Sequence, residues 1–177
     1  LDALYAFTDC EVSLAPNSCV VFDDKPVFMG ISDILRISAD RTRFLLKREL
    51  EIELGELQET WHFASLEKIF IENRIYRDIE ECETWEEILA AIHEGLKPHI
   101  KHLLREVTDE DVTRLTEIRI KRISKFDSFK ADERIAALEE DIDKVRHHLE
   151  HLTEYAIDWF KKLKNKYGKG RERKTEL

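Results

Sequence analysis

The sequence predicts a mainly α-helical protein, with a long antiparallel coiled-coil stalk, a small helical lobe at its tip and a short N-terminal β-hairpin or sheet remnant. Helical periodicity over residues 32–73 and 128–167 carries this prediction, and the second stretch contains neither Gly nor Pro. Only five Gly and three Pro occur in 177 residues, which leaves little material for the many turns of an all-β fold.

The composition narrows the function classes. The chain is 42% hydrophobic and 38% charged, a charge content typical of elongated helical proteins, and its net charge of -9 makes it as a whole a poor nucleic-acid binder. Its three cysteines share no CxxC spacing, so we expect no disulfide framework, no structural zinc and a reducing, cytoplasmic setting. The apolar runs are too short to span a membrane.

Residues 1–31 differ from the rest of the chain. Alternating or β-branched runs at 10–14 and 18–22 are separated by Pro16 and Asn17, and a break at 23–26 precedes a third run at 27–29. We expect the last two runs to form a hairpin. Because so small a sheet is marginal in isolation and the chain opens on Leu1, we expect a piece of a longer protein, although a self-contained hairpin packed on the helices remains an alternative.

Residues 32–73 are predicted to form the outgoing stalk helix. Ser32 is a good N-cap, and Asp33 in the first turn complements the helix dipole. Gly55 interrupts the apolar stripe and predicts a kink or a close helix crossing. Aromatic residues become frequent from Trp61 onward, where we expect the helix to enter the lobe.

Residues 74–127 are predicted to form the helical lobe. Thr84 is expected to cap a short helix that ends at Gly95, and Pro98 to start another. The Thr108-x-x-Asp111 pattern predicts a further N-terminus, whose helix continues through Ile118, Ile120 and Ile123. A break at 126–128 precedes the returning helix.

Residues 128–167 are predicted to form the returning stalk helix, and 168–177 a linker toward a missing C-terminal domain. The helix carries apolar residues in 3-4 alternation, the seam of a heptad repeat. The seam residues are Ile135, Leu138, Ile142, Val145, Leu149, Leu152, Ala156, Trp159 and Leu163.

No catalytic constellation is evident in the sequence. A phosphate-cradling glycine loop is missing, and we interpret the i,i+4 pair His147 and His151 as a solvated helix face rather than a metal site, since both lie off the seam. A basic run at 114–125 is interleaved with apolar residues, which favours packing or self-association over nucleic-acid binding.

Several segments resemble bacterial type II DNA topoisomerase A subunits, those of DNA gyrase and topoisomerase IV, from the end of the tower region through the coiled-coil exit gate. The resemblance covers nearly the whole chain. It rests on Leu4-Tyr5-Ala6-Phe7-Thr8, Val20-Val21-Phe22 with Lys25-Pro26, Ser32-Asp33-Ile34-Leu35, Arg41-Thr42-Arg43, the run Leu115-Thr116-Glu117-Ile118-Arg119-Ile120-Lys121-Arg122-Ile123, and the tail 167–176.

This resemblance implies an exit-gate segment that forms a homodimer through its lobe and opens to release the transported duplex during an ATP-dependent change of DNA topology. The catalytic tyrosine and the metal-binding acids of the family lie outside the segment. We therefore expect no catalytic residue, metal ligand or cofactor here, with Mg and ATP used through other regions, and no activity of the segment alone. The implied partners are a second copy, duplex DNA and the ATPase B subunit.

Two sets of site residues follow as candidates. The dimer contact is placed at Leu115, Ile118, Arg119, Arg122, Ile123 and Phe126, and the DNA contact at Arg36, Arg41 and Arg43. Hinging is expected near Gly55 or at the junctions between stalk and lobe. A structural adaptor or an RNA- or protein-docking arm without a gate role is the alternative.

Overall fold

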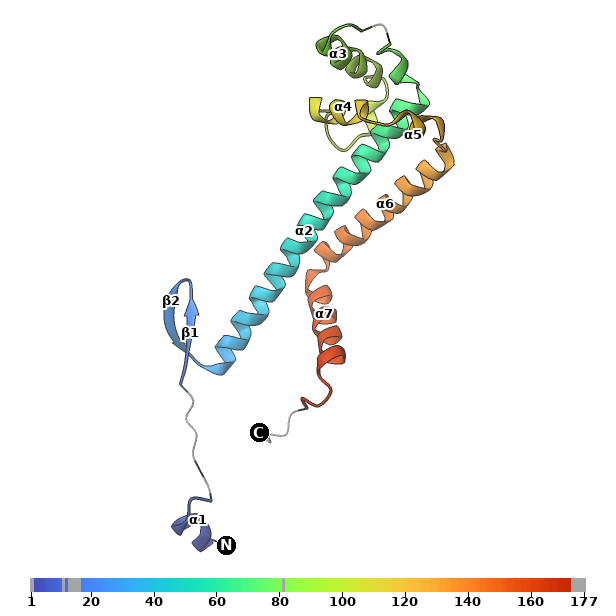
Figure 1. Ribbon diagram of the computed structural model, residues 1–177. Coiled ribbons are helices and arrows are strands. Elements are labelled where there is room, and N and C mark those ends of the chain that lie inside the picture. The colour runs from blue at the N-terminus through green and yellow to red at the C-terminus, as the bar shows by residue number, and fades with distance from the viewer. Residues whose placement is uncertain (1, 11, 13–16, 81, 173–177) are drawn as a thin grey trace. The chain divides into compact units, whose positions relative to one another are not determined.

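The computed structural model describes residues 2–10, 12, 17–80 and 82–172 (Figure 1). Its contacts divide the chain into two compact units, Leu1–Leu45 and Leu46–Leu177. Helices dominate the described residues, and a two-stranded sheet lies near the N-terminus. The predicted mainly α-helical class is therefore confirmed.

The first unit contains α1 (Asp2–Phe7), the strands β1 (Ser18–Phe22) and β2 (Lys25–Met29), and the start of α2. The strands pair antiparallel, with Ser18 opposite Met29, which confirms the expected hairpin. Asp23 and Asp24 have φ of 47° and 60°, the left-handed geometry that a two-residue hairpin turn requires. Of the expected strand at 10–14, Cys10 lies in a turn, Val12 has no regular structure, and the rest lies outside the described residues.

Helix α2 (Ile31–Glu72) begins in the first unit and ends in the second. The predicted N-cap at Ser32 lies two residues too late. The Gly30 carbonyl accepts the Ile34 N–H at 3.1 Å, so Gly30 holds the N-cap position and Ser32 lies in the first turn. At Gly55 the helix is unbroken, and an added Cβ would meet no atom within 4 Å. The predicted close crossing is wrong, because no other element within the described residues comes within 4 Å of a Cβ at this position.

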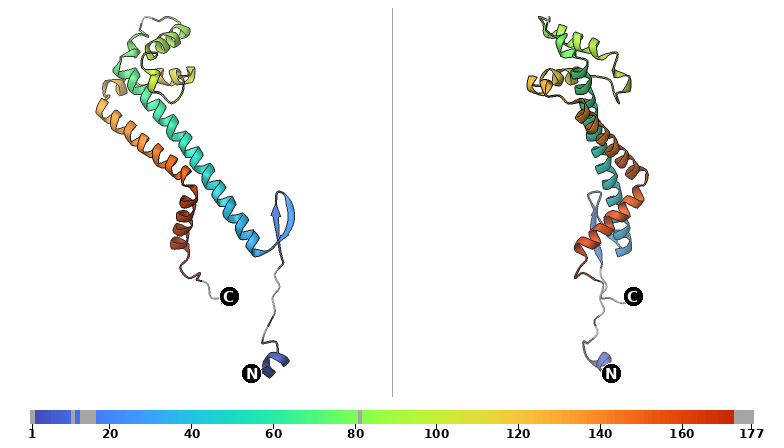
Figure 2. Two further views of the ribbon diagram at one scale, coloured as in Figure 1. Left: turned by 180° about the vertical axis from the view of Figure 1, so that it is seen from behind. Right: turned by 90° about the vertical axis from the view of Figure 1, so that its right-hand side faces the viewer.

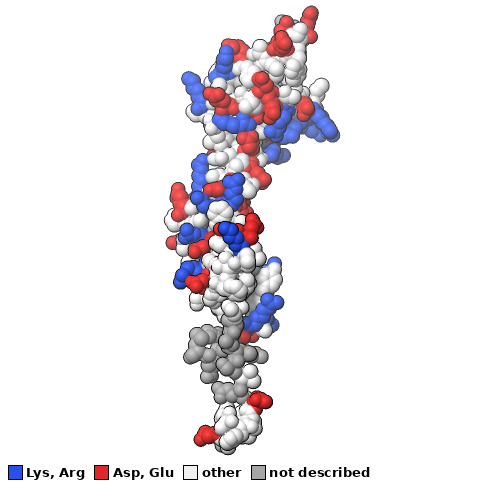
Figure 3. All heavy atoms as spheres, turned by 90° about the vertical axis from the view of Figure 1, so that its left-hand side faces the viewer, with Lys and Arg blue, Asp and Glu red and all other residues white. Residues whose placement is uncertain are grey.

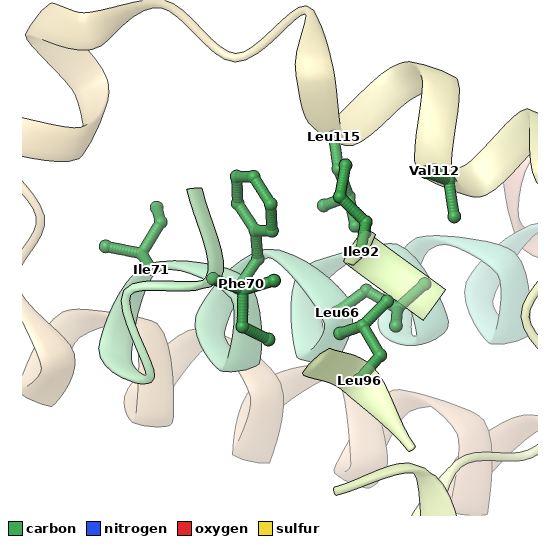
Figure 4. Packing of buried hydrophobic residues seen from close by; sticks show 8 residues of the cluster. Leu66, Phe70, Ile71, Ile92, Leu96, Val112 and Leu115 are labelled. Atoms are coloured by element: carbon green, nitrogen blue, oxygen red, sulfur yellow. The ribbon is translucent and has the colours of Figure 1, made fainter. Parts of the chain in front are cut away.

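The lobe consists of the end of α2 followed by η1 (Ile75–Arg77), α3 (Trp85–Leu96), η2 (Ile100–His102), α4 (Asp109–Thr116) and α5 (Ile120–Ser124). Figure 4 shows apolar side chains of α2, α3 and α4 converging on one core. The buried residues of this core are Leu66, Phe70, Ile71, Ile75, Ile92, Leu96, Val112 and Leu115. The lobe is therefore assembled onto the end of α2.

Local signals set the helix starts of the lobe. Thr84 with Glu87, and Thr108 with Asp111, both form reciprocal capping boxes, which confirms the two predicted N-termini. The prediction that Gly95 ends α3 is wrong. The helix continues through Leu96, and a Cβ at Gly95 would lie 2.8 Å from Ile75 Cγ2, so close packing against η1 is the reason for the glycine.

A second correction concerns the helix expected to run from Thr108 through Ile123. It is broken into α4 and α5, with Arg119 in extended conformation (φ −65°, ψ 138°) between them. The break allows Ile118 and Ile123 to pack against the lobe core while Ile120 remains 82% exposed.

The returning helix is also two helices, α6 (Ser128–Glu150) and α7 (Leu152–Tyr167), which meet at His151. Within the second unit, α6 lies beside α2 and runs in the opposite direction (Figures 1 and 2). Trp61 Nε1 donates to Glu139 Oε1 at 3.0 Å, and Lys68 pairs with Asp132. All nine predicted seam residues are buried or half-buried, and most other positions of the two helices are exposed.

Candidate functional site

An apolar groove of about 480 Å³ opens on the surface of the lobe. One wall comes from residues 76–88 and includes Tyr76 and Trp85, and the other comes from 115–123 and includes Ile118 and Ile120. Trp85 is 49% exposed and Ile120 is 82% exposed. Such large apolar side chains beside an apolar groove are typical of a surface that another molecule covers.

Basic residues gather on the 115–123 side of the groove. A second depression adjoins it at Ile118 and is lined by Phe63, Arg114, Glu117, Ile118, Arg119, Lys121, Arg122 and Lys125. Two of these cations already have partners, because the Arg114 guanidinium lies 4.0 Å from the centre of the Phe63 ring and Arg122 pairs with the buried Glu67. We call residues 114–125 the basic wall.

Acidic residues gather on the opposite side. Residues 77–87 carry Asp78, Glu80, Glu83, Glu86 and Glu87 among the described positions, against the single cation Arg77. Glu80 lines the groove, and Glu87 is turned back to accept the backbone N–H groups of Glu83 and Thr84. The pKa of Glu87 is lowered by these backbone hydrogen bonds. We call residues 77–87 the acidic wall.

The candidate dimer-contact residues occupy different depths around the groove. Arg119 and Arg122 are exposed, and Ile118, Ile123 and Phe126 are half-buried against the lobe core. Leu115 is only 1% exposed and belongs to the core, so it supports the groove from beneath. Ile120, Trp85 and the acidic wall were not among the candidates, although the alternation of bases and isoleucines around Ile120 is visible in the sequence.

The candidate DNA-contact arginines lie on α2 in the first unit, and all three side chains are exposed. Arg36 lies 3.5 Å from Asp33, a solvent-exposed pair. Arg36 and Arg43 are seven residues apart and share one helix face, whereas Arg41 points elsewhere. At most two of the three can therefore face one ligand at the same time.

A partly buried polar cluster fastens the lobe to α2, and no pattern in the sequence predicts it. Arg105 donates to both oxygens of Asp111 (2.6 and 3.0 Å) and, through Nε and Nη2, to Glu59 of α2 at 2.8 Å. Burial alone would raise the pKa of Asp111, but hydrogen bonds from Arg105 and Thr108 outweigh it and hold the pKa well below its usual range. The hydrogen bonds that Arg105 donates to Glu59 and to Asp111 raise the pKa of Arg105.

His62 lies beside this cluster and is 1% exposed. Its Nε2 is 3.6 Å from Asp111 Oδ2, beyond hydrogen-bond distance, and neither ring nitrogen has a partner among the described residues. Burial, followed by the charge of Arg105, lowers the pKa of His62. The ring is therefore held neutral in the folded lobe.

Other site chemistries find no support in the described part of the chain. It contains no group of three or more His, Cys, Asp or Glu side chains placed to hold a metal ion. His147 and His151 stack with ring centroids 4.3 Å apart at the junction of α6 and α7. No helix within the described residues has the length and apolar character needed to cross a membrane.

Two comparisons with known proteins identify relatives of this chain. The family model for the A subunits of DNA gyrase and topoisomerase IV matches residues 1–164. The chain is also 32% identical to the A subunit of DNA topoisomerase 4 from Borreliella burgdorferi, over 100% of its own length and 28% of that protein's length. The chain thus spans little more than a quarter of this curated relative. On these two matches, it belongs to the family of DNA gyrase and topoisomerase IV A subunits.

Proposed function

We propose that this chain is the exit-gate segment of a type II DNA topoisomerase A subunit, which pairs with a second copy through its lobe and separates to release a transported duplex. The observation that carries the proposal is the apolar groove with the 82% exposed Ile120 on its rim. Family membership supplies the context in which such a surface meets an identical one.

The helix pair suits the role of a lever. In this proposal residues 32–73 and 128–167 form the stalk, 74–127 the gate lobe, and 168–177 a linker toward a C-terminal domain. Leu46 and Leu50 of α2, and Ala156 of α7, are buried, and the pKa of Tyr155 is raised by burial and by Glu49 and Glu53. Because the seam is packed at both ends of the pair, motion of the stalk would be carried to the lobe.

The remaining partners belong to the whole enzyme. Duplex DNA would contact the exposed arginines near the start of α2, either Arg36 and Arg43 on one helix face or Arg41 on another. The B subunit, Mg and ATP would act through regions outside this chain. A hinge at Gly55 is disfavoured because α2 is unbroken there, so we place the hinge at His151, where α6 and α7 meet, or at the lobe junctions.

Cross-linking in the full-length A subunit, reconstituted with its B subunit, tests the proposal. After all native cysteines of the A subunit, Cys10, Cys19 and Cys82 among them, are replaced by Ser, Ile120→Cys is treated with a short thiol-reactive bifunctional linker. We expect a covalent dimer of A subunits that still cleaves DNA but no longer completes strand passage.

The matched control is Ile157→Cys, because Ile157 is 49% exposed on α7, away from the lobe groove. It should give no cross-link and full activity. Equal cross-linking at both positions, or none at Ile120, would contradict a gate contact at this groove and would favour the adaptor function.

A further inference from the structure

The two walls of the lobe groove carry opposite charge. The acidic wall presents five described carboxylates against one arginine, and the basic wall five cations against Glu117. Figure 3 shows this edge of the lobe: acidic side chains lie at its tip, basic ones gather farther down on the same side, and uncoloured atoms separate them. The apolar groove runs between the walls.

Such a face is complementary to itself. In a two-fold symmetric contact, each surface patch of one copy meets the patch that its partner carries on the other side of the symmetry axis. If the axis runs along the groove, the acidic wall of each copy covers the basic wall of the other, and the exposed Ile120 enters the apolar strip between them. If two copies met with the axis across the groove, like charges would face each other, which disfavours that orientation.

We propose that the gate contact is an isologous, charge-polarised dimer in which the acidic wall of each copy pairs with the basic wall of the other. The proposal rests on the proposed function and specifies its contact. It also implies regulation by ionic strength, because rim ion pairs are screened by salt whereas the apolar strip is not. A small apolar contact framed by exposed ion pairs suits an interface that must open in every cycle.

Three residues of each wall are available for a test. On the acidic wall these are Glu80, Glu83 and Glu86, and on the basic wall Arg119, Lys121 and Lys125, none of which takes part in an ion pair among the described residues. Glu87 is spared because it caps α3, and Arg122 because it neutralises the buried Glu67.

The experiment uses the 177-residue chain and two triple variants, Glu80→Lys/Glu83→Lys/Glu86→Lys and Arg119→Glu/Lys121→Glu/Lys125→Glu. In the first variant both walls are basic, and in the second both are acidic. Sedimentation velocity at low salt should show that each variant alone dimerises about ten-fold more weakly, or worse, than the parent. An equimolar mixture should restore the dimer, because both contacts of the heterodimer then join opposite charges.

A matched triple variant, Glu133→Lys/Glu150→Lys/Glu154→Lys, changes the net charge by the same amount and sign as the first wall variant, but at exposed positions of α6 and α7. It should dimerise like the parent. If the parent dimerises and the wall variants dimerise equally well, the charge-polarised contact is wrong while the gate proposal stands. A parent that stays monomeric overturns both. A monomeric chain whose duplex-DNA binding is lost only in the Arg119 triple variant would assign the basic wall to DNA instead.

Discussion

At the scale of single residues, Arg105 links two elements of the lobe. It joins the buried Asp111 of α4 to Glu59 of α2 with four hydrogen bonds. Asp111 also closes the capping box with Thr108, so loss of its partner would leave a capping carboxylate buried and uncompensated. Removal of one partner of a buried charge pair is costly because the desolvation penalty of the other remains.

Arg105→Met should therefore lower the free energy of unfolding by about 2 kcal/mol or more, measured by urea denaturation. Arg105→Lys should recover only part of the loss, since an ammonium cannot bridge two carboxylates in a fixed fork. The control is Arg48→Met, which removes an exposed pair with Glu51 and should cost less than about 0.5 kcal/mol. Equal losses at Arg48 and Arg105 would contradict the bridging role.

His62 makes the lobe sensitive to mild acid. The folded state lowers its pKa below the ordinary 6.5, so the unfolded chain binds the proton more readily. Stability contributed by neutral His62 is present above pH 6.5 and is lost as pH falls toward the folded-state pKa. Glu59 and Asp111 have lowered pKa values, so the stability they contribute is lost only below their ordinary pKa of about 4.

His62→Leu should therefore flatten the pH dependence of unfolding as pH falls below about 6.5. In the parent, His62 contributes a slope of up to about 1.4 kcal/mol per pH unit in that window. Urea denaturation followed by tryptophan fluorescence at several pH values measures the slope. Parallel curves for parent and variant would show that His62 already accepts a proton in the folded lobe.

The sequence predicts the capping box of Thr108 and Asp111, but it does not predict the polar cluster that Asp111 forms with Arg105. The three-residue spacing of Thr108 and Asp111 is a local signal, and the capping box forms as expected. Arg105 meets Glu59 across 46 residues of sequence, and His62 meets Asp111 only because α2 packs on α4. Pairings of that kind depend on tertiary packing, which no spacing rule contains.

At the scale of elements, the two glycines of the helices have different physical reasons. Gly95 is required by the contact of α3 with the buried Ile75, whereas Gly55 lies in open space within α2. Sequence patterns placed both glycines correctly inside or beside helices but assigned a terminus to the first and a kink or crossing to the second. Helix ends and crossings are set by neighbouring elements, so the pattern of one helix cannot distinguish them.

Alanine at these two glycines should move stability in opposite directions. Gly95→Ala should lower the free energy of unfolding by about 1–3 kcal/mol, because its Cβ would overlap a side chain that has no room to move. Gly55→Ala should raise it by about 0.5–1 kcal/mol through better helix propensity. Thermal or urea unfolding of both variants checks the pair. Stabilisation by both would contradict the tight packing at Ile75.

The break between α6 and α7 lies within the predicted seam. The heptad seam continues without interruption through Leu149 and Leu152, yet the backbone at His151 leaves helical geometry (φ −108°, ψ 40°). The seam residues stay buried or half-buried on both sides of the break. Apolar periodicity therefore predicts which face is covered but not where the backbone leaves helical geometry.

At the scale of the whole molecule, family membership and one surface of the lobe support the same proposed function. Apolar periodicity and charge in the sequence were enough to locate the lobe and its basic run. The acidic wall became part of the candidate site only because folding brings residues 77–87 opposite α5. The groove between them has the composition of a contact that forms and separates. Dimerisation through this groove is the central claim.

Sedimentation equilibrium of the 177-residue chain tests that claim most directly. We predict a concentration-dependent mass that approaches twice the 21.0 kDa of one chain, abolished by Ile120→Glu and preserved in Ile157→Glu. A mass of 21.0 kDa at every concentration would contradict the claim, and so would a dimer that both substitutions leave intact.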